Sequence, residues 1–115
     1  MQARRVGAIH PHYLALVVMV KTYTLRSKVV RYPGMAAWYF AYVDKKQAEE
    51  IREKHSKVKR GFGSVQVVVT LGKSKWNTSI FPDKQSGTYL LPLKAQVRRA
   101  EGVDDGDTIH FTLEI

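Results

Sequence analysis

Hydrophobic and polar residues alternate most regularly at the end of the chain, where Ile109, Phe111 and Leu113 take turns with polar residues. A period of two places successive side chains on opposite faces of a β-strand, so this segment predicts a strand with one buried face. Weaker alternation and flanking turn residues predict further strands at residues 21–32, 64–71, 75–81 and 88–91.

For two of the predicted strands, the sequence also indicates which faces are buried. In the segment 21–32, the apolar positions define a buried face, and Arg26 and Lys28 fall on the opposite one. That outer face is therefore expected to be cationic. The run WYFAYV at residues 38–43 is aromatic without polar alternation, which predicts a strand buried on both faces.

Two segments have a helical period instead. Asp44, with Gln47 three residues later, forms a capping-box pattern in front of an amphipathic segment. Pro92 suits the first turn of a second, shorter helix, and Gly102 suits the left-handed residue that follows its last turn. The apolar face of the first helix is expected to consist of Ala48, Ile51, His55 and Val58.

The order of these elements contains a repeat, because a strand–helix–strand unit at 38–71 is followed by another at 88–115. The fold expected is mainly β, a barrel of about six strands with two helices. Residues 19–115 are expected to form this single domain. Residues 1–18 lack a matching period and precede Met19, a second start-competent methionine, so they are expected to form a poorly ordered extension.

The net charge of +9 is unevenly distributed. Residues 19–63 hold eleven Lys and Arg against four Asp and Glu, whereas residues 64–115 hold six of each sign. Such an excess favours a cationic face for an anionic partner, with solubility as the alternative reading. The residues expected to form this basic face are Arg26, Lys28, Lys54, Lys57, Lys59 and Arg60.

Several kinds of chemistry find no support in the sequence. Without any cysteine there are no disulfides, thiolate nucleophiles or zinc–thiolate sites, which fits a reducing cytoplasm. The Gly72-Lys73-Ser74 segment lacks the first glycine of a phosphate-binding loop, and the aspartates at 104–107 fit a turn. No catalytic constellation, metal site or cofactor motif is found, and no apolar run reaches the roughly 20 residues that span a bilayer. The sequence therefore predicts neither an enzyme nor a membrane protein.

Two strings suggest relatives. The string LPLKAQVRRAEGVDDGD resembles the helix-and-turn signature of AbrB/MazE-type swapped-hairpin proteins. A closer resemblance extends over residues 21–115, through GFGSVQVVVTLG and KWNTSIFPDKQSGTYLLPLKAQ, to the domain-of-unknown-function family nineteen-oh-five. Some of its relatives are fused to a YdeI/OmpD-associated domain. This resemblance implies a double-split barrel within one chain, capped by two helices, and implies no function.

Two functional hypotheses remain open. The first is a non-catalytic domain that binds nucleic acid or another polyanion through the basic face, as AbrB-type relatives bind DNA. The second is a small-molecule or protein-partner module, with a pocket formed by Trp38, Tyr42, Trp76 and Tyr89. Arg98 is expected to be structural, paired with Asp107. The oligomeric state is left open, and a monomer is compatible with both hypotheses.

Overall fold

A computed structural model describes residues 21–34, 38–58 and 63–115, without the side chains of residues 55–58. The extension expected at residues 1–18 lies outside the described residues.

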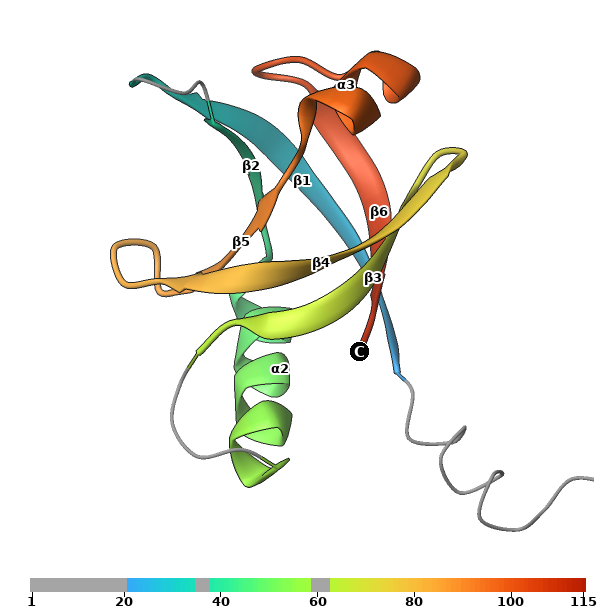
Figure 1. Cartoon of the computed structure of the whole chain (residues 1–115). Coiled ribbons are helices and arrows are strands. Elements are labelled where there is room, and N and C mark those ends of the chain that lie inside the picture. The colour runs from blue at the N-terminus through green and yellow to red at the C-terminus, as the bar shows by residue number, and fades with distance from the viewer. Residues whose placement is uncertain (1–20, 35–37, 59–62) are drawn as a thin grey trace, which may run out of the picture.

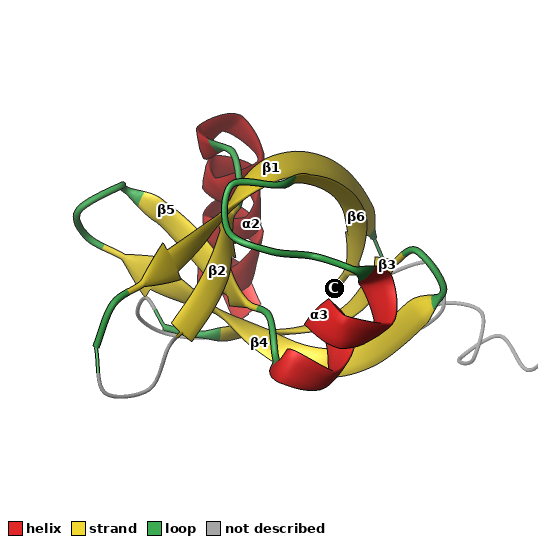
Figure 2. Ribbon diagram, turned by 90° about the horizontal axis from the view of Figure 1, so that it is seen from above, coloured by secondary structure: helices red, strands yellow, loops and turns green. Residues whose placement is uncertain are grey.

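Within this part, the chain forms a closed antiparallel barrel with strand order β1-β2-β5-β4-β3-β6 (Figures 1 and 2). Figure 1 shows helix α3 at one end of the barrel and helix α2 at the other. The mainly β fold of six strands and two helices is therefore confirmed. The strands are β1 (Thr22–Tyr32), β2 (Trp38–Tyr42), β3 (Val65–Leu71), β4 (Ser74–Asp83), β5 (Thr88–Pro92) and β6 (Thr108–Glu114), and the helices are α2 (Lys45–Val58) and α3 (Ala95–Glu101).

The two strand–helix–strand units meet where β2 pairs with β5. The Val43 N–H donates to the Tyr89 carbonyl at 3.0 Å, and the Leu93 N–H donates to the Tyr39 carbonyl at 2.9 Å. The donor Leu93 lies 50 positions after the donor Val43, and the acceptor Tyr89 lies 50 positions after the acceptor Tyr39. Each unit therefore donates one of the two bonds and accepts the other, from equivalent positions. This geometry agrees with the repeat expected from the element order.

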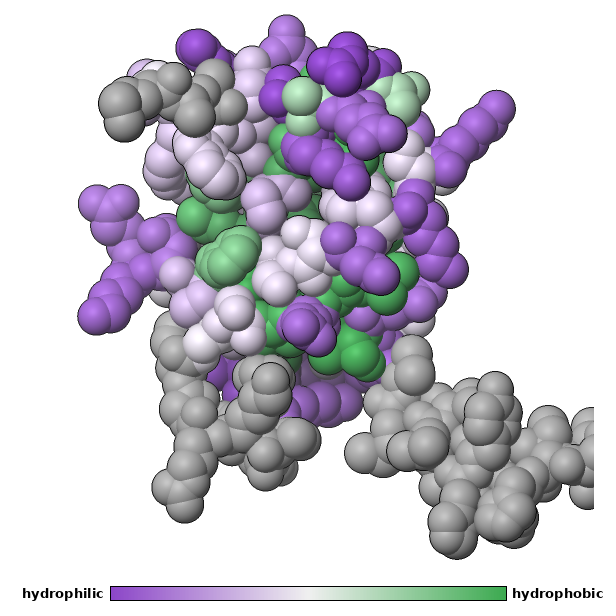
Figure 3. Space-filling model, in the orientation of Figure 1, coloured by the Kyte–Doolittle hydropathy of each residue, from purple (hydrophilic) through white to green (hydrophobic). Residues whose placement is uncertain are grey.

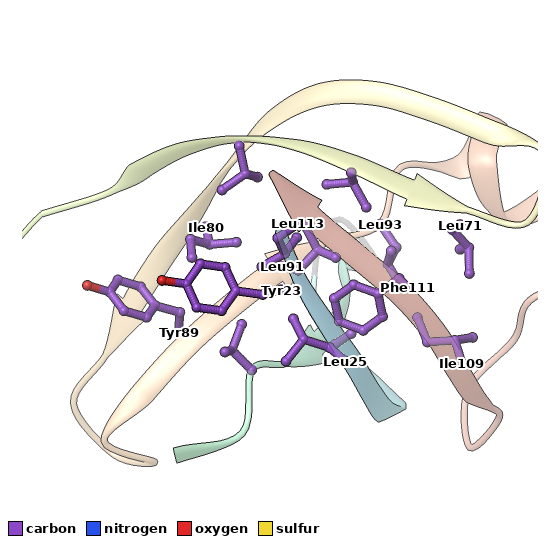
Figure 4. Packing of buried hydrophobic residues seen from close by; sticks show 14 of the residues in the cluster. Tyr23, Leu25, Leu71, Ile80, Tyr89, Leu91, Leu93, Ile109, Phe111 and Leu113 are labelled. Carbon is purple, nitrogen blue, oxygen red and sulfur yellow. The ribbon is translucent and has the colours of Figure 1, made fainter. Parts of the chain in front are cut away.

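The barrel interior is filled by the inward-facing residues of all six strands (Figure 4). The alternation expected for β6 is confirmed, because Ile109, Phe111 and Leu113 are buried between exposed or half-buried neighbours. Leu113 pairs with Tyr23 on one side and with Val69 on the other, so it lies at the point where β6 joins β1 to β3.

The helix caps form largely as expected. The Asp44 carboxylate accepts a hydrogen bond from the Gln47 N–H at 2.9 Å, and the Gln47 side chain donates to the same carboxylate at 2.8 Å. Ala48 and Ile51 are buried against the barrel. At the end of α3, Gly102 has a φ of 64°, in the left-handed region where glycine costs least.

Two sequence expectations are wrong. Strand β2 is not buried on both faces, since Trp38 is 57% exposed and only Ala41 is fully buried. Its outer side stays uncovered because the helices lie at the barrel ends (Figure 1). Pro92 does not open the second helix either. Pro92 is instead the last residue of β5, and α3 begins only at Ala95. The chain stays with the sheet beyond Pro92 because the Leu93 N–H donates to the Tyr39 carbonyl.

Candidate binding groove beside helix α3

The two barrel ends differ because the two helices differ in length. Helix α2 has 14 residues, and below it Tyr89 is 0% exposed. Burial raises the pKa of Tyr89, and the nearby Arg52 partly offsets that rise. Helix α3 has only 7 residues, and the corresponding Tyr39 is half-buried beside Arg98. A shorter helix covers less of the barrel, so the α3 end keeps an opening.

The opening follows the line where β4 separates from β5. Strand β5 pairs with β4 only from Phe81 onward, whereas the earlier half of β4 pairs with β3 alone. Between the separated strands and α3 lies a groove of about 320 Å³, called the α3 groove below. It is lined by Trp38, Tyr39, Trp76, Asn77, Thr78, Pro92, Leu93, Lys94, Ala95 and Arg98.

Arg98 is held in place by two contacts. Its Nε–H donates to the Leu93 carbonyl at 3.0 Å, and its guanidinium carbon lies 3.7 Å from the centre of the Tyr39 ring. A guanidinium has five N–H donors, and a single one of them is used in that hydrogen bond. The remaining edge of this half-buried cation is thus positioned to meet an anion in the groove.

The expected pair between Arg98 and Asp107 is wrong. In the described part of the chain, Arg98 forms no ion pair with Asp107 or another carboxylate, whereas Glu50 pairs with both Lys21 and Lys54. Asp107 instead accepts a hydrogen bond from the Asp104 N–H at 2.8 Å. The Asp107 carboxylate is thus used within the turn that follows α3. Arg98 has no carboxylate partner in the described part of the chain.

The groove lining combines aromatic rings with positive charge. It contains three aromatic side chains and two cations, Lys94 and Arg98, and no Asp or Glu. Both tryptophans of the chain are among the rings. Flat rings beside cations that have no carboxylate partner among the described residues suit a ligand that has a planar part and a negative charge.

Of the four residues expected to form an aromatic pocket, the structure brings Trp38 and Trp76 together. Tyr89 belongs to the core instead. The Tyr42 hydroxyl lies 2.9 Å from the Tyr32 hydroxyl on the barrel surface, and this hydrogen bond, helped by burial, raises the pKa of Tyr42 to about 12.

The expected basic face is only partly described. Arg26 and Lys28 are exposed on the outer side of β1, where Arg26 pairs in register with His110. Lys54 lies on α2 with its ammonium 3.6 Å from the Glu50 carboxylate. The side chain of Lys57, and Lys59 and Arg60 as a whole, lie outside the described residues. The described cations of this set therefore lie on two different elements.

Sequence reasoning missed Tyr39, Lys94 and Arg98 as groove residues. Lys94 and Arg98 are four positions apart, a spacing that places two side chains on one side of a helix start. That spacing could have indicated a shared site. The spacing was not recognised because Pro92 was predicted to open the helix and Arg98 was predicted to pair with Asp107.

A metal site and a membrane-spanning helix are both absent from the described residues. These residues contain no group of three or more His, Cys, Asp or Glu side chains that could hold a metal ion. The two helices of the described part are also too short and too polar to cross a membrane.

Comparison with curated proteins gives no match for this chain. A family model described as "Domain of unknown function (DUF1905)" matches residues 26–113. The match extends from the middle of β1 almost to the end of β6 and so includes the whole α3 groove. The chain therefore belongs to the DUF1905 family.

Proposed function

We propose that this protein is a non-catalytic binding domain whose α3 groove holds an anionic ligand with a planar ring. One observation carries the proposal. The barrel end left open by the short helix α3 is lined by three aromatic rings and two cations, without a carboxylate. The lining also lacks the imidazole, carboxyl and thiol groups that most often supply general acids, bases and nucleophiles, which favours binding over catalysis.

The proposed binding mode divides the ligand between two kinds of contact. The planar part would stack on Trp38 or Trp76, and the negative group would meet Arg98 and Lys94. Stacking of one ring contributes about 1–3 kcal/mol, and a hydrogen bond to a charged group about 1.5–3 kcal/mol. After the cost of immobilising the ligand, a dissociation constant on the order of 10 μM to 1 mM is expected.

Intrinsic fluorescence provides a direct assay, because both tryptophans line the groove. Thymidine 5′-monophosphate serves as a probe with both parts, and thymidine and inorganic phosphate each supply one part. The proposal expects saturable quenching by the monophosphate, at concentrations at least roughly tenfold lower than for either fragment. Equal responses to all three compounds, or no response to any, would refute it.

Variants inside and outside the α3 groove test whether the monophosphate binds there. Arg98→Gln and Lys94→Gln should each weaken binding of the monophosphate by roughly tenfold, the loss of one charge-assisted hydrogen bond. Arg99→Gln is the matched control, since Arg99 is the exposed neighbour of Arg98 and lies outside the groove lining. If all three variants weaken binding equally, net charge and not the groove is responsible.

Polyanion binding through the basic face stays a second candidate. The exposure of both Arg26 and Lys28 on one side of β1 favours it. Duplex DNA should then bind with a steep salt dependence, since each neutralised phosphate releases counterions. The double variant Arg26→Gln, Lys28→Gln should reduce that affinity and the salt slope. Unchanged duplex binding by this variant would count against the basic face.

A further inference from the structure

Trp38 belongs to two neighbouring hollows. It lines the α3 groove, and its exposed ring also borders a second hollow of about 580 Å³ on the outer side of the barrel. Four aromatic residues line the second hollow, and they are called the aromatic face below: Tyr32, Trp38, Phe40 and Phe81. Through Trp38, the groove and the aromatic face form one continuous surface.

The aromatic face comes from three strands. In β1 and β2, Tyr32 pairs in register with Trp38, so their side chains share the outer side. Phe40 lies next, with its ring nearly parallel to that of Trp38 at 7° and a centroid distance of 6.0 Å. Phe81 of β4 pairs with Leu90 of β5 and completes the face.

These rings remain exposed to solvent. Trp38 is 57% exposed, Phe81 46% and Tyr32 36%, and they are the large hydrophobic residues exposed in the described part of the chain. Their gathering at one place is what distinguishes them, because single exposed apolar residues are common but a contiguous patch marks a binding surface. Figure 3 shows weakly polar and apolar residues over β4 and β5, below the strongly hydrophilic residues around α3.

The charge of the two hollows and of the whole chain indicates which kind of partner can bind. In the part of the chain that the structure describes, no carboxylate lines either hollow. Asp83 and Asp105 follow or contact residues next to the aromatic face, and both accept hydrogen bonds: Asp83 from the N–H and hydroxyl of Ser86, and Asp105 from the Arg31 N–H at 3.0 Å. With a net charge of +9, a second copy of this chain would be repelled, whereas a polyanion would be attracted.

We propose that the ligand is a single-stranded nucleic acid that extends from the α3 groove across Trp38 onto the aromatic face. This inference rests on the function proposed above. Single strands bind proteins through cations that contact phosphates and aromatic rings on which successive bases stack. In a duplex, the faces of the bases are stacked on each other and cannot reach such rings. The combination of exposed rings with Lys94 and Arg98 therefore favours a single strand over a duplex.

The surface is long enough for several nucleotides. Strand β4 supplies Trp76 to the groove and Phe81 to the aromatic face. Phe81 follows Trp76 by five positions, a rise of about 17 Å along the strand. This odd spacing places the two side chains on opposite faces of β4, so the proposed path between them passes over Trp38, which lines both hollows. Stacked bases rise about 3.4 Å each along one strand, so a chain of several nucleotides spans this length.

The test compares thymidylate chains of increasing length by tryptophan quenching and by anisotropy of labelled strands. The proposal expects the affinity to rise at least fivefold from the mononucleotide to the trimer and again to the hexamer. A hexamer of uridylate should bind similarly. A G·C-rich duplex of about 12 base pairs, long enough to stay paired, should bind at least tenfold more weakly than a single strand of the same length. Phe81→Ala should weaken the hexamer at least fivefold and leave the mononucleotide unchanged. Gln66→Ala, an exposed change on β3, is the control for both probes.

The outcomes separate this inference from the function on which it rests. If the mononucleotide binds but longer chains gain nothing, or if Phe81→Ala leaves hexamer binding unchanged, the extended path is wrong and the groove proposal stands. If no probe binds, both fail. Duplex binding equal to single-strand binding would overturn the inference in favour of surface charge. A dimer in sedimentation that Phe81→Ala dissociates, together with no binding of the hexamer, would assign the aromatic face to self-association.

Discussion

Replacing Arg98 by lysine should destabilise the domain even though the charge is kept. The guanidinium stacks on Tyr39 at 3.7 Å while its Nε–H bonds to the Leu93 carbonyl at 3.0 Å. A lysine ammonium is a point charge and cannot make both contacts with this geometry. The cation–π contact contributes about 0.5–2 kcal/mol and the charged hydrogen bond about 1.5–3 kcal/mol, of which lysine recovers part.

A net loss of about 1–3 kcal/mol follows for Arg98→Lys, which for a domain of this size lowers Tm by roughly 4–12 °C. The assay is urea denaturation followed by circular dichroism, with Arg99→Lys as the matched control. The exposed Arg99 should change stability by less than about 0.5 kcal/mol. A double-mutant cycle with Tyr39→Leu then isolates the stack, with an expected coupling of about 0.5–2 kcal/mol. Equal effects at Arg98 and Arg99, or no coupling to Tyr39, would refute the assigned contacts.

Three other variants test the fold and its pH dependence. Leu113→Ala, at a fully buried site held by strands on both sides, should cost about 3–5 kcal/mol in the same urea assay. Gly72→Ala should cost about 1–2 kcal/mol in that assay, because Gly72 has a φ of 60° and an added Cβ would overlap the Glu101 carboxylate. Because the pKa of Tyr42 is raised from 10.0 to about 12, its contribution to stability is present below pH 10.0 and lost as the pH rises through about 12. Tyr32→Phe should lower that pKa in a spectrophotometric titration, and an unchanged value would contradict the hydrogen bond between the two hydroxyls.

The local structure was largely predictable because it depends on neighbours in sequence. The alternation in β6 identified the buried side of the strand, and Asp44 with Gln47 identified the start of α2. Pro92 was misplaced for a tertiary reason, since the bond from the Leu93 N–H to Tyr39 keeps the chain in the sheet beyond the proline.

The candidate site was less predictable because it depends on what covers each ring. Tyr89 and Trp76 are both aromatic strand residues, yet the barrel encloses Tyr89 while Trp76 lines the groove. The difference arises from the length of α3 and from the place where β4 leaves β5. Neither is visible in the aromatic pattern alone.

The net charge of each half of the chain did not indicate the α3 groove either. Residues 64–115 have no net charge, which suggested a neutral half. In the structure, Asp104 and Asp107 bond within the turn after α3, and Glu101 accepts a hydrogen bond from Ser74. Two of the six cations of the same half, Lys94 and Arg98, line the groove. Local separation of charge, not the regional sum, produces a cationic site here.

The most direct test of the α3 groove is a proton–nitrogen correlation NMR titration with thymidine 5′-monophosphate. The spectrum of this chain contains two indole N–H signals, from Trp38 and Trp76, and both residues line the groove. The account predicts that both signals and the Arg98 backbone amide shift together and saturate, while the amides of Arg26 and Lys28 stay in place. Stationary indole signals with shifts at Arg26 and Lys28 would contradict it and assign binding to the outer side of β1.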